Sequence, residues 1–226
     1  MAEVNLLEAY PKAKRNVKAR TRDKEVNRQL ALQFGREYFD GTREQGYGGY
    51  RYDGRWIPIA RRIVSHFELK AGDHILDVGC AKGFLVKDLM TVCPGLEAFG
   101  LDISEYAVLN CESEVVGRLH VGNALRLPFP DRSFQAVVSI NTVHNLDHGG
   151  CITALREIER LSPGRGFIQV DAYRNEAERQ VFEDWMLTAR TYGTPEQWEQ
   201  LIGEAGYTGD YFWTILEVDP EWTATE

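Results

Sequence analysis

The segment ILDVGCAKGFL, residues 75–85, contains side chains and glycines that suit the binding of a nucleotide. Gly79 and Gly83 lack a Cβ atom, so the backbone can bend tightly there and come close to a ligand. Asp77 can accept a hydrogen bond near the start of the following helix. The G-x-x-x-G spacing differs from the G-x-G-x-x-G of dinucleotide folds, and no Lys-Ser or Lys-Thr pair of a phosphate loop is present. The segment therefore indicates a nucleotide site of another type.

Two further segments place polar groups at the ends of expected strands. Asp102, in FGLDIS, follows the glycine loop at roughly the distance at which an acidic side chain meets ribose hydroxyls in nucleotide-binding sheets. Asn123 and Ala124 follow the next expected strand. Carboxylate and carboxamide oxygens accept hydrogen bonds from sugar hydroxyls and base amino groups.

His144, in SINTVHNLDHGG, is the candidate catalytic base, because an unperturbed imidazole has a pKa of about 6.5. The alternative, which stays open, is a hydrogen-bonded loop residue that only shapes the pocket. His144, Asp147 and His148 also have the spacing of one helix face, which could hold a metal ion. We expect no metal site, because two glycines follow and no Glu or Cys completes a metal motif.

Helical and strand periods alternate from residue 56 onward, and strands separated by helices of this length form βαβ units with a parallel sheet. Strands are expected at 74–79, 96–103, 117–123, 134–141, 164–171 and 210–218, and helices at 55–69, 84–93, 104–115, 149–161, 175–190 and 194–206. The sequence thus predicts an α/β fold with a doubly wound, mostly parallel sheet and helices on both faces. Because parallel strands end at one edge, the polar groups described above should gather there.

Four blocks, in order, carry a family resemblance. They are ILDVGCAKG, GLDIS, GNALRLPFPDRSFQ and ALREIERLSPGRG, within residues 70–172. In this series the chain resembles the class I S-adenosylmethionine (SAM) dependent methyltransferases of the small-molecule group, which have a Rossmann-like fold. Two positions depart from the family pattern, since Ala81 replaces a glycine and Asn123 replaces an aspartate. A third departure lies at the end of the chain, where the family sheet usually closes with an antiparallel pair of strands but only DPEWTATE follows residue 218.

The resemblance implies SAM as cofactor and S-adenosylhomocysteine as product. It implies a role for Asp102 at the ribose, for Ile103 beside the adenine, for Asn123 and the Ala124 N–H at the adenine edge, and for Asn141 near the methionine part. The full set of implied cofactor-binding residues is Asp77, Gly79, Cys80, Ala81, Gly83, Asp102, Ile103, Asn123, Ala124, Asn141 and Tyr47.

In similar methyltransferases the segment before the first strand lies over the cofactor as a lid, and the resemblance implies the same for GYGGYRYDGRW, residues 46–56. Its aromatic faces would attract a sulfonium cation, and its glycines permit tight folding. The alternative is that its aromatic residues only pack an N-terminal helical arm onto the sheet. We therefore divide the chain into an arm and lid at residues 1–55 and a SAM-binding domain at residues 56–226. The candidate substrate-binding residues are Tyr50, Arg51, Tyr52, Arg55, Trp56, Tyr173 and Arg174.

Composition limits the partners that the chain can have. The net charge of −8 disfavours a nucleic-acid surface, although residues 11–28 form a basic run that is either a solvated arm or an anion contact. The four cysteines lack C-x-x-C spacing, so free thiols are expected. The sequence has no apolar run of membrane-spanning length and no signal-peptide pattern, which favours the cytoplasm and no membrane partner.

The hypothesis that unites these observations is methyl transfer from SAM to a small polar acceptor, by O-methylation of a sugar or a hydroxylated natural product. One alternative is an RNA or protein methyltransferase that uses the basic arm, Lys12 to Arg28, as a tether. Another is a protein that binds SAM without transferring its methyl group. A homodimer is possible, and the sequence favours neither a monomer nor a dimer.

Overall fold

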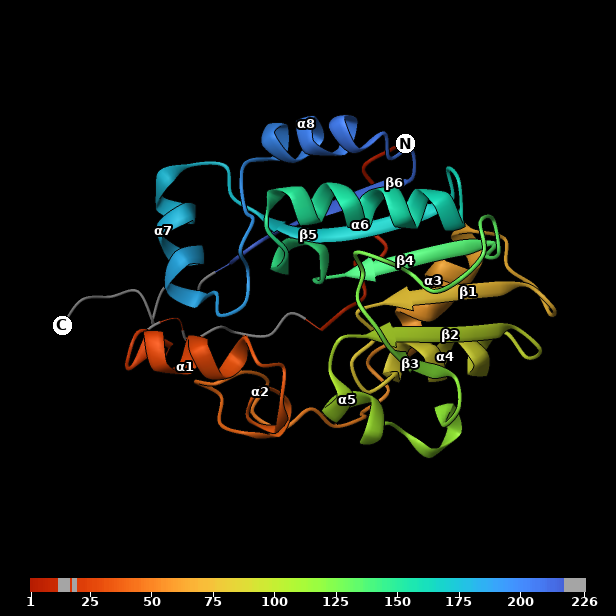
Figure 1. Ribbon diagram of the computed structural model, residues 1–226, viewed down its shortest axis with the longest axis horizontal. Helices are drawn as coiled ribbons and strands as arrows, with labels where there is room; N and C mark the ends of the chain where they lie inside the picture. Colours follow the sequence, from red (N-terminus) through yellow and green to blue (C-terminus); the bar gives the residue numbers. More distant parts are fainter. Residues whose placement is uncertain (12–16, 18–19, 218–226) are drawn as a thin grey trace.

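The protein forms a six-stranded sheet in the order β3-β2-β1-β4-β5-β6, and every pair of neighbouring strands is parallel in the part of the chain that the structure describes (Figure 1). This structure is a computed structural model, and it describes residues 1–11, 17 and 20–217. The strands are β1 (His74–Val78), β2 (Glu97–Asp102), β3 (Leu119–Val121), β4 (Ala136–Ile140), β5 (Gly166–Ala172) and β6 (Asp210–Ile215). The predicted doubly wound α/β fold is confirmed.

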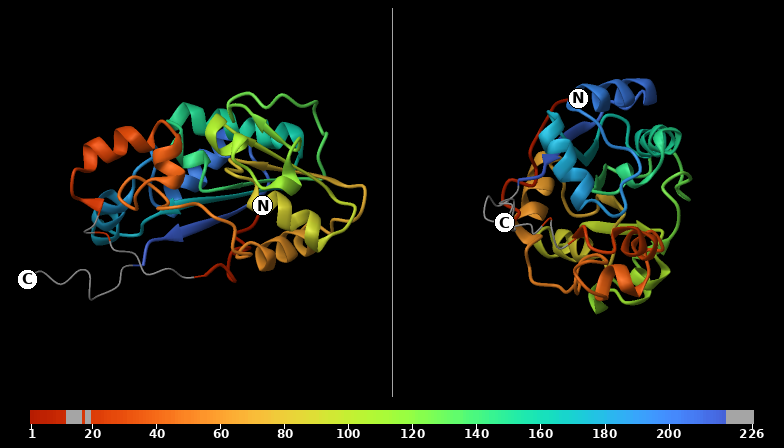
Figure 2. Two further views of the ribbon diagram at one scale, coloured as in Figure 1. Left: turned by 90° about the horizontal axis from the view of Figure 1, so that it is seen from below. Right: turned by 90° about the vertical axis from the view of Figure 1, so that its left-hand side faces the viewer.

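Helices cover both faces of the sheet (Figure 2). One face packs against α6 (His148–Leu161) and α8 (Pro195–Ala205), and the other against α3 (Ile57–His66) and α4 (Phe84–Val92). The remaining helices are α1 (Lys24–Ala31), α2 (Arg36–Asp40), α5 (Glu105–Leu109) and α7 (Glu176–Trp185), with short 3-10 turns η2 (Ser113–Val115) and η3 (Val143–Asn145). None of the described helices is long and apolar enough to cross a bilayer.

Local signals place the helix starts well, and two helices end earlier than the sequence predicts. Thr194 caps α8 in a capping box with Gln197. The helix expected over residues 104–115 stops at Leu109, because the following segment is drawn onto α4 by Lys87, whose Nζ lies 2.9 Å from carboxylate oxygens of Glu112 and Glu114. The helix expected over residues 175–190 stops at Trp185.

The far edge of the sheet shows how the sheet ends although only a short segment follows its last strand. β6 pairs directly with β5 in parallel register, so the described sheet contains no antiparallel pair. The outer edge of β6 is partly covered by the N-terminal residues, since the Val4 N–H donates to the Tyr211 carbonyl at 2.9 Å and the Tyr211 N–H donates to the Ala2 carbonyl at 3.1 Å. Two backbone hydrogen bonds from the start of the chain thus shield the edge strand.

The part of the N-terminal arm that carries α1 and α2 lies beyond the carboxyl ends of the strands, next to α7 and the start of α5 (Figure 1). Arg20 donates to the Gly46 carbonyl at 2.6 Å and stacks over Trp185, with its guanidinium carbon 3.7 Å from the ring centroid. Lys24 and Arg28 donate to the carbonyls of Glu183 and Ala189. Much of the predicted basic run, residues 12–16 and 18–19, lies outside the described residues, and the division of the chain at residue 55 stays a prediction.

Close packing at Gly100 in β2 gives a testable prediction about the stability of the fold. A Cβ atom at this position would lie 2.5 Å from the Cys80 Sγ, so Gly100→Ala should lower the free energy of unfolding by about 1–3 kcal/mol. Gly203→Ala is the matched control, because nothing lies within 4 Å of the added Cβ, and it should raise the free energy by about 0.5–1 kcal/mol. Urea unfolding measures both values, and an unchanged stability of Gly100→Ala would contradict this packing.

Candidate functional site

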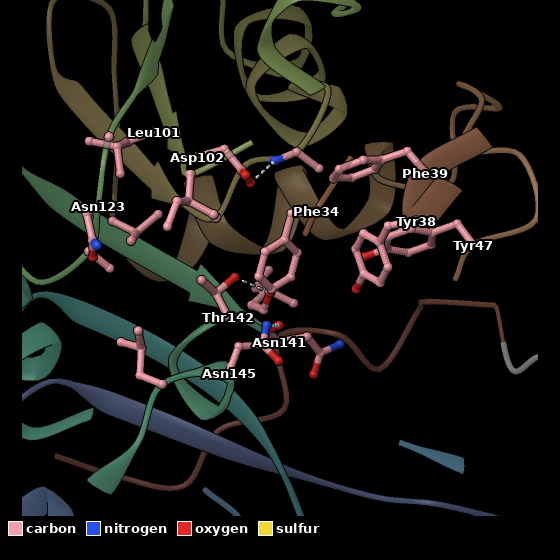
Figure 3. Close-up of a pocket in the computed structure, with 18 residues that line it drawn as sticks. Phe34, Tyr38, Phe39, Tyr47, Leu101, Asp102, Asn123, Asn141, Thr142 and Asn145 are labelled. Carbon is pink, nitrogen blue, oxygen red and sulfur yellow. Dashed lines mark hydrogen bonds between the residues drawn. The ribbon is translucent and has the colours of Figure 1, made fainter. Parts of the chain in front are cut away.

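A pocket opens at the carboxyl ends of the strands, between the sheet and the arm, with an empty volume of about 730 Å³ that is partly open to solvent. Figure 3 shows Leu101 and Asn123 at one end, Tyr38, Phe39 and Tyr47 at the other, and Phe34 between them. The wall consists of Phe34, Tyr38, Phe39, Tyr47, Val78, Gly79, Ala81, Leu101, Asp102, Ile103, Gly122, Asn123, Ala124, Ile140, Asn141, Thr142, Asn145 and Leu146.

The turn after β1 is hydrogen-bonded onto the end of β2. The N–H groups of Gly79 and Cys80 donate to the Leu101 carbonyl at 2.7 and 3.2 Å, and the Ala81 N–H donates to the Asp102 Oδ2 at 2.7 Å. Gly79 has a φ of 87°, and a Cβ atom there would lie 1.9 Å from the Thr142 Oγ1. Only glycine fits this position, so the backbone itself forms the pocket wall.

Two buried carboxylates lie at this turn. Asp102 lines the pocket, and its Oδ1 accepts from the Ser104 N–H at 2.8 Å, while burial raises the pKa of its carboxyl. Asp77 is buried and is not among the wall residues. Burial, followed by the charge of Asp102, raises the pKa of Asp77 to about 8. A cation bound in the pocket would favour the ionised form of Asp77.

The residues expected beside an adenine gather at one end of the pocket. Ile103 is half exposed, and Asn123 and Ala124 complete this end. The Asn123 Oδ1 already accepts from the Leu125 N–H at 2.9 Å, which leaves a second lone pair for a ligand. Cys80 and Gly83 do not line the pocket, since Cys80 is a buried free thiol and Gly83 precedes α4 with a φ of 76°.

Aromatic side chains of the arm form the opposite end of the pocket. Phe39 and Tyr47 stack with ring centroids 5.8 Å apart, and Tyr38 meets both rings edge-on. Burial raises the pKa of the hydroxyls of Tyr38 and Tyr47, so both stay protonated at neutral pH. Sequence reasoning named only Tyr47 from this group. The segment FGREYFD, with Phe34, Tyr38 and Phe39 at helical spacing, carried the signal that it missed.

A charged cluster fastens the arm to the turn after β1. The Lys82 Nζ donates to Asp40 at 2.7 and 2.9 Å and to the Tyr50 carbonyl at 3.1 Å, and the Tyr106 hydroxyl donates to the Asp40 Oδ2 at 2.7 Å. Partial burial alone would raise the pKa of the Asp40 carboxyl, but the hydrogen bonds from Lys82 and Tyr106 outweigh it and lower the pKa. Asp40 directly follows Phe39, so this cluster holds the aromatic end over the pocket.

The lid residues proposed to bind a substrate lie outside the pocket wall. Tyr50 stacks on Phe84 with ring centroids 4.6 Å apart. The Tyr52 hydroxyl donates to Asp88 at 2.6 Å, a bond that raises the pKa of Tyr52 to about 12. These two rings pack the segment onto α4.

The other substrate candidates also lie apart from the wall, and several have partners. Arg55 pairs with Asp53 at 2.5 Å, and Arg174 pairs with Glu178 at 2.5 Å. Trp56 packs on Tyr10, Tyr173 lies near Tyr192, and Arg51 is exposed. The structure therefore brings together most of the cofactor candidates and does not bring the substrate candidates to the same pocket.

His144 lies behind the pocket wall and is 4% exposed. Its Nδ1 accepts from the Asp171 N–H at 3.1 Å, and its carbonyl accepts from the N–H groups of Arg190 and Thr191. An acceptor at Nδ1 places the hydrogen of the neutral ring on Nε2. Burial lowers the pKa of the imidazole, and the Asp171 carboxylate opposes this shift.

The metal interpretation of the same segment finds no geometric support. Asp147 caps α6 by accepting from the Gly150 N–H at 2.8 Å, and His148 is exposed and lies 3.6 Å from Glu204. Among the described residues, no group of three or more His, Cys, Asp or Glu side chains could hold a metal ion.

The pocket fits SAM on three observations. The Asp102 carboxylate stands at a strand end as a hydroxyl acceptor, and the glycine turn brings bare backbone to the ligand. Leu101, Ile103 and Leu146 give the wall apolar side chains that suit a flat base. Asp102 would hold the ribose, Asn123 and Ala124 the adenine edge, and Gly79 with Asn141 the methionine part.

Comparisons with known proteins agree with this geometry. A family described as "Methyltransferase domain" matches residues 76–169. Demethylmenaquinone methyltransferase of Symbiobacterium thermophilum is 34% identical over 62% of this chain and 59% of its own length. The O-methyltransferase resE of Aspergillus sclerotiorum is 25% identical over 66% of this chain and 60% of its own length. The chain thus spans about three fifths of the length of these relatives.

Solved structures support the fold. A methyltransferase of Haloferax volcanii, determined in a complex with the Trm112 methyltransferase activator, has a TM-score of 0.53 and 23% identity, with coverage of 65% of this chain and 66% of that chain. The shared architecture is the Rossmann-like sheet with helices on both faces.

The charged cluster at Lys82 predicts that ligand binding in the pocket depends on the contact between the arm and the turn after β1. Lys82→Met should weaken binding of S-adenosylhomocysteine about tenfold, because a charge-assisted hydrogen bond contributes about 1.5–3 kcal/mol and its loss releases the aromatic end. Arg118→Met is the matched control, since it breaks a 2.8 Å ion pair with Glu97 outside the pocket wall. Titration calorimetry measures both affinities, and hydrogen exchange of the Tyr47 and Tyr50 amides reports the arm. Equal affinities in the two variants would show that the cluster does not hold the pocket closed.

Proposed function

We propose that the chain is a class I SAM-dependent methyltransferase and that it transfers a methyl group from SAM to an oxygen of a small hydroxylated acceptor, a sugar or a hydroxylated natural product. When bound, SAM would supply an electrophilic methyl group; on its transfer to the acceptor oxygen, the sulfur would keep the electron pair of the broken bond and the hydroxyl proton would go to water. A cytoplasmic location and a homodimer stay predictions.

The observation that carries this proposal is the pocket at the strand ends. The Asp102 carboxylate, the glycine turn and the adenine-side residues gather at one end, and space lined by aromatic rings continues beyond them. Alignment of two reactants in a closed pocket can supply much of the rate of such a displacement. Support for oxygen as the acceptor atom comes from the resemblance to an O-methyltransferase.

His144 fits a positioning role better than the role of a base. Its Nδ1 faces the Asp171 N–H, and the hydrogen on Nε2 makes that atom a donor. Through its carbonyl, His144 fastens the loop at Arg190 and Thr191 to the segment that carries Asn141 and Asn145. In this proposal the ring keeps one edge of the pocket in place.

The alternative of an RNA or protein methyltransferase has less support. Among the described residues of the basic run, Arg20, Lys24 and Arg28 donate to backbone carbonyls of the protein itself. Cations used in this way are poorly placed to bind phosphates. The alternative of a protein that binds SAM without transferring its methyl group is separated from catalysis by the following experiment.

The proposed function is tested by incubating the chain with methyl-labelled SAM and a cell extract. The extract is then separated into small molecules, RNA and protein, and the label in each fraction is measured. We expect label in the small-molecule fraction with the wild-type chain and at least about a hundredfold less with Asp102→Ala, which removes the ribose acceptor. Asp184→Ala, a carboxylate outside the pocket wall, is the matched control and should retain transfer.

Label in RNA or protein would overturn the small-molecule assignment. Calorimetry on the same preparation measures the binding of S-adenosylhomocysteine. If the chain binds it but no fraction of any extract carries label, the result would favour a protein that binds SAM without transferring its methyl group. Loss of both binding and transfer in the wild-type chain would overturn the proposal as a whole.

The role of His144 predicts a small kinetic effect and a change in stability with pH. His144→Gln keeps an acceptor for the Asp171 N–H, so kcat should fall less than about tenfold, whereas loss of a general base costs about a hundredfold or more. The stability that the neutral ring contributes is present above pH 6.5, its ordinary pKa, and is lost as the pH falls through the lowered pKa. His144→Gln should lack this loss, and His120→Gln, on the exposed edge strand, should retain it. A hundredfold fall in kcat would restore His144 as the base.

A further inference from the structure

An unsatisfied polar atom lies at the pocket, on a residue that the sequence analysis did not name. Asn145 lines the wall, and its Nδ2 donates to the Asn141 carbonyl at 3.3 Å. Because a carbonyl can only accept, the nitrogen must face Asn141, and the Oδ1 is the remaining end of the carboxamide. This oxygen is buried and has no hydrogen-bond partner among the described residues. A buried acceptor without a partner costs free energy, which a ligand donor can recover.

The charge of the wall limits what the ligand can be. Asp102 is the only acidic or basic wall residue in the described part of the chain, and Lys82, the nearest basic neighbour in sequence, is turned to Asp40. The described wall offers an anionic acceptor no Lys or Arg side chain, so only the sulfur of the methyl donor could balance its charge beside the Asp102 carboxylate. A cationic acceptor would meet the positive sulfur of the methyl donor. The wall therefore favours a neutral acceptor.

The shape of the far end favours a flat molecule. Tyr38, Phe39 and Tyr47 present rings at this end, grouped opposite Asn123 in Figure 3, and Phe34 lies between the two ends. Aromatic side chains pack well against planar ligands, and the protonated hydroxyls of Tyr38 and Tyr47 are neutral donors. Asn141 and Asn145 lie below Phe34 in the same view, between the two ends.

We propose that the acceptor is a neutral, planar, hydroxylated ring that packs against the aromatic end and donates its hydroxyl to the Asn145 Oδ1. This inference rests on the proposed function and narrows its acceptor from hydroxylated molecules in general to flat ones. Asn145 is then a specificity residue that turns the acceptor hydroxyl toward the cofactor, and the basic residues of the lid take no part.

Binding to the full chain saturated with S-adenosylhomocysteine tests the proposal without a known substrate. The probes are dihydroxynaphthalene, its carboxylated counterpart dihydroxynaphthoate, and methyl glucoside, each measured by calorimetry. We expect dihydroxynaphthalene to bind roughly tenfold more tightly than either of the others, since tenfold corresponds to one lost charged or stacking contact. Tighter binding of the naphthoate or the glucoside, or no binding of dihydroxynaphthalene, would overturn the proposal.

Substitution of Asn145 separates the acceptor role from a cofactor role. Asn145→Leu should weaken dihydroxynaphthalene roughly tenfold and leave the affinity for S-adenosylhomocysteine within about twofold. Asn110→Leu is the matched control, because its Nδ2 also donates to the carbonyl four residues earlier, at 2.8 Å, but outside the pocket wall. Asn145→Ala serves if the leucine variant does not fold.

A parallel loss of S-adenosylhomocysteine affinity in the Asn145 variants would overturn this inference, because Asn145 would then hold the cofactor. The proposed function would survive that result. Failure of the wild-type chain to bind S-adenosylhomocysteine at all would instead reject the proposed function, so the two failures are distinguishable.

Discussion

The hydrogen bonds between the turn after β1 and the end of β2 are the interaction on which the rest of the site depends. The turn must pass close over its neighbour strand, which requires glycine at residue 79 and places the Ala81 N–H on the Asp102 carboxylate. This arrangement places the buried Asp102 carboxylate at the pocket, and α4 begins at the edge of the pocket. The close contact of Gly100 with Cys80 is part of the same constraint, since a larger residue in β2 would push the turn away.

The sheet and the N-terminal arm each form part of the pocket wall. The sheet supplies one wall of the pocket, with its carboxylate and backbone groups, and the arm supplies aromatic rings that enclose the other end. A charged cluster at Asp40 and Lys82 joins the two, so cofactor loop and acceptor end are mechanically connected. The charge of this cluster is internally balanced, which leaves an almost uncharged pocket and so restricts the chemistry of the acceptor.

Much of the fold was predictable because its signals are local. Periodicity located all six strands, and caps such as Thr194 and Ser104 located helix starts. The end of the helix at Leu109 was not predictable, since Lys87 draws the next residues onto α4 across 25 positions of sequence. The parallel closure of the sheet by β6, with the N-terminal residues at its outer edge, likewise depends on contacts between distant parts of the chain.

The sequence by itself determined the parallel order of elements and therefore the sheet edge at which Asp102, Asn123 and Asn141 meet, because strand ends follow from periodicity and connection length. Only the tertiary structure decided which polar groups stay available to a ligand. Arg55 and Arg174 are paired, His144 is enclosed with a fixed tautomer, and Asn145 keeps a free oxygen at the pocket. Residue type cannot show this, since the availability of a polar group depends on neighbours that the fold brings from elsewhere in the chain.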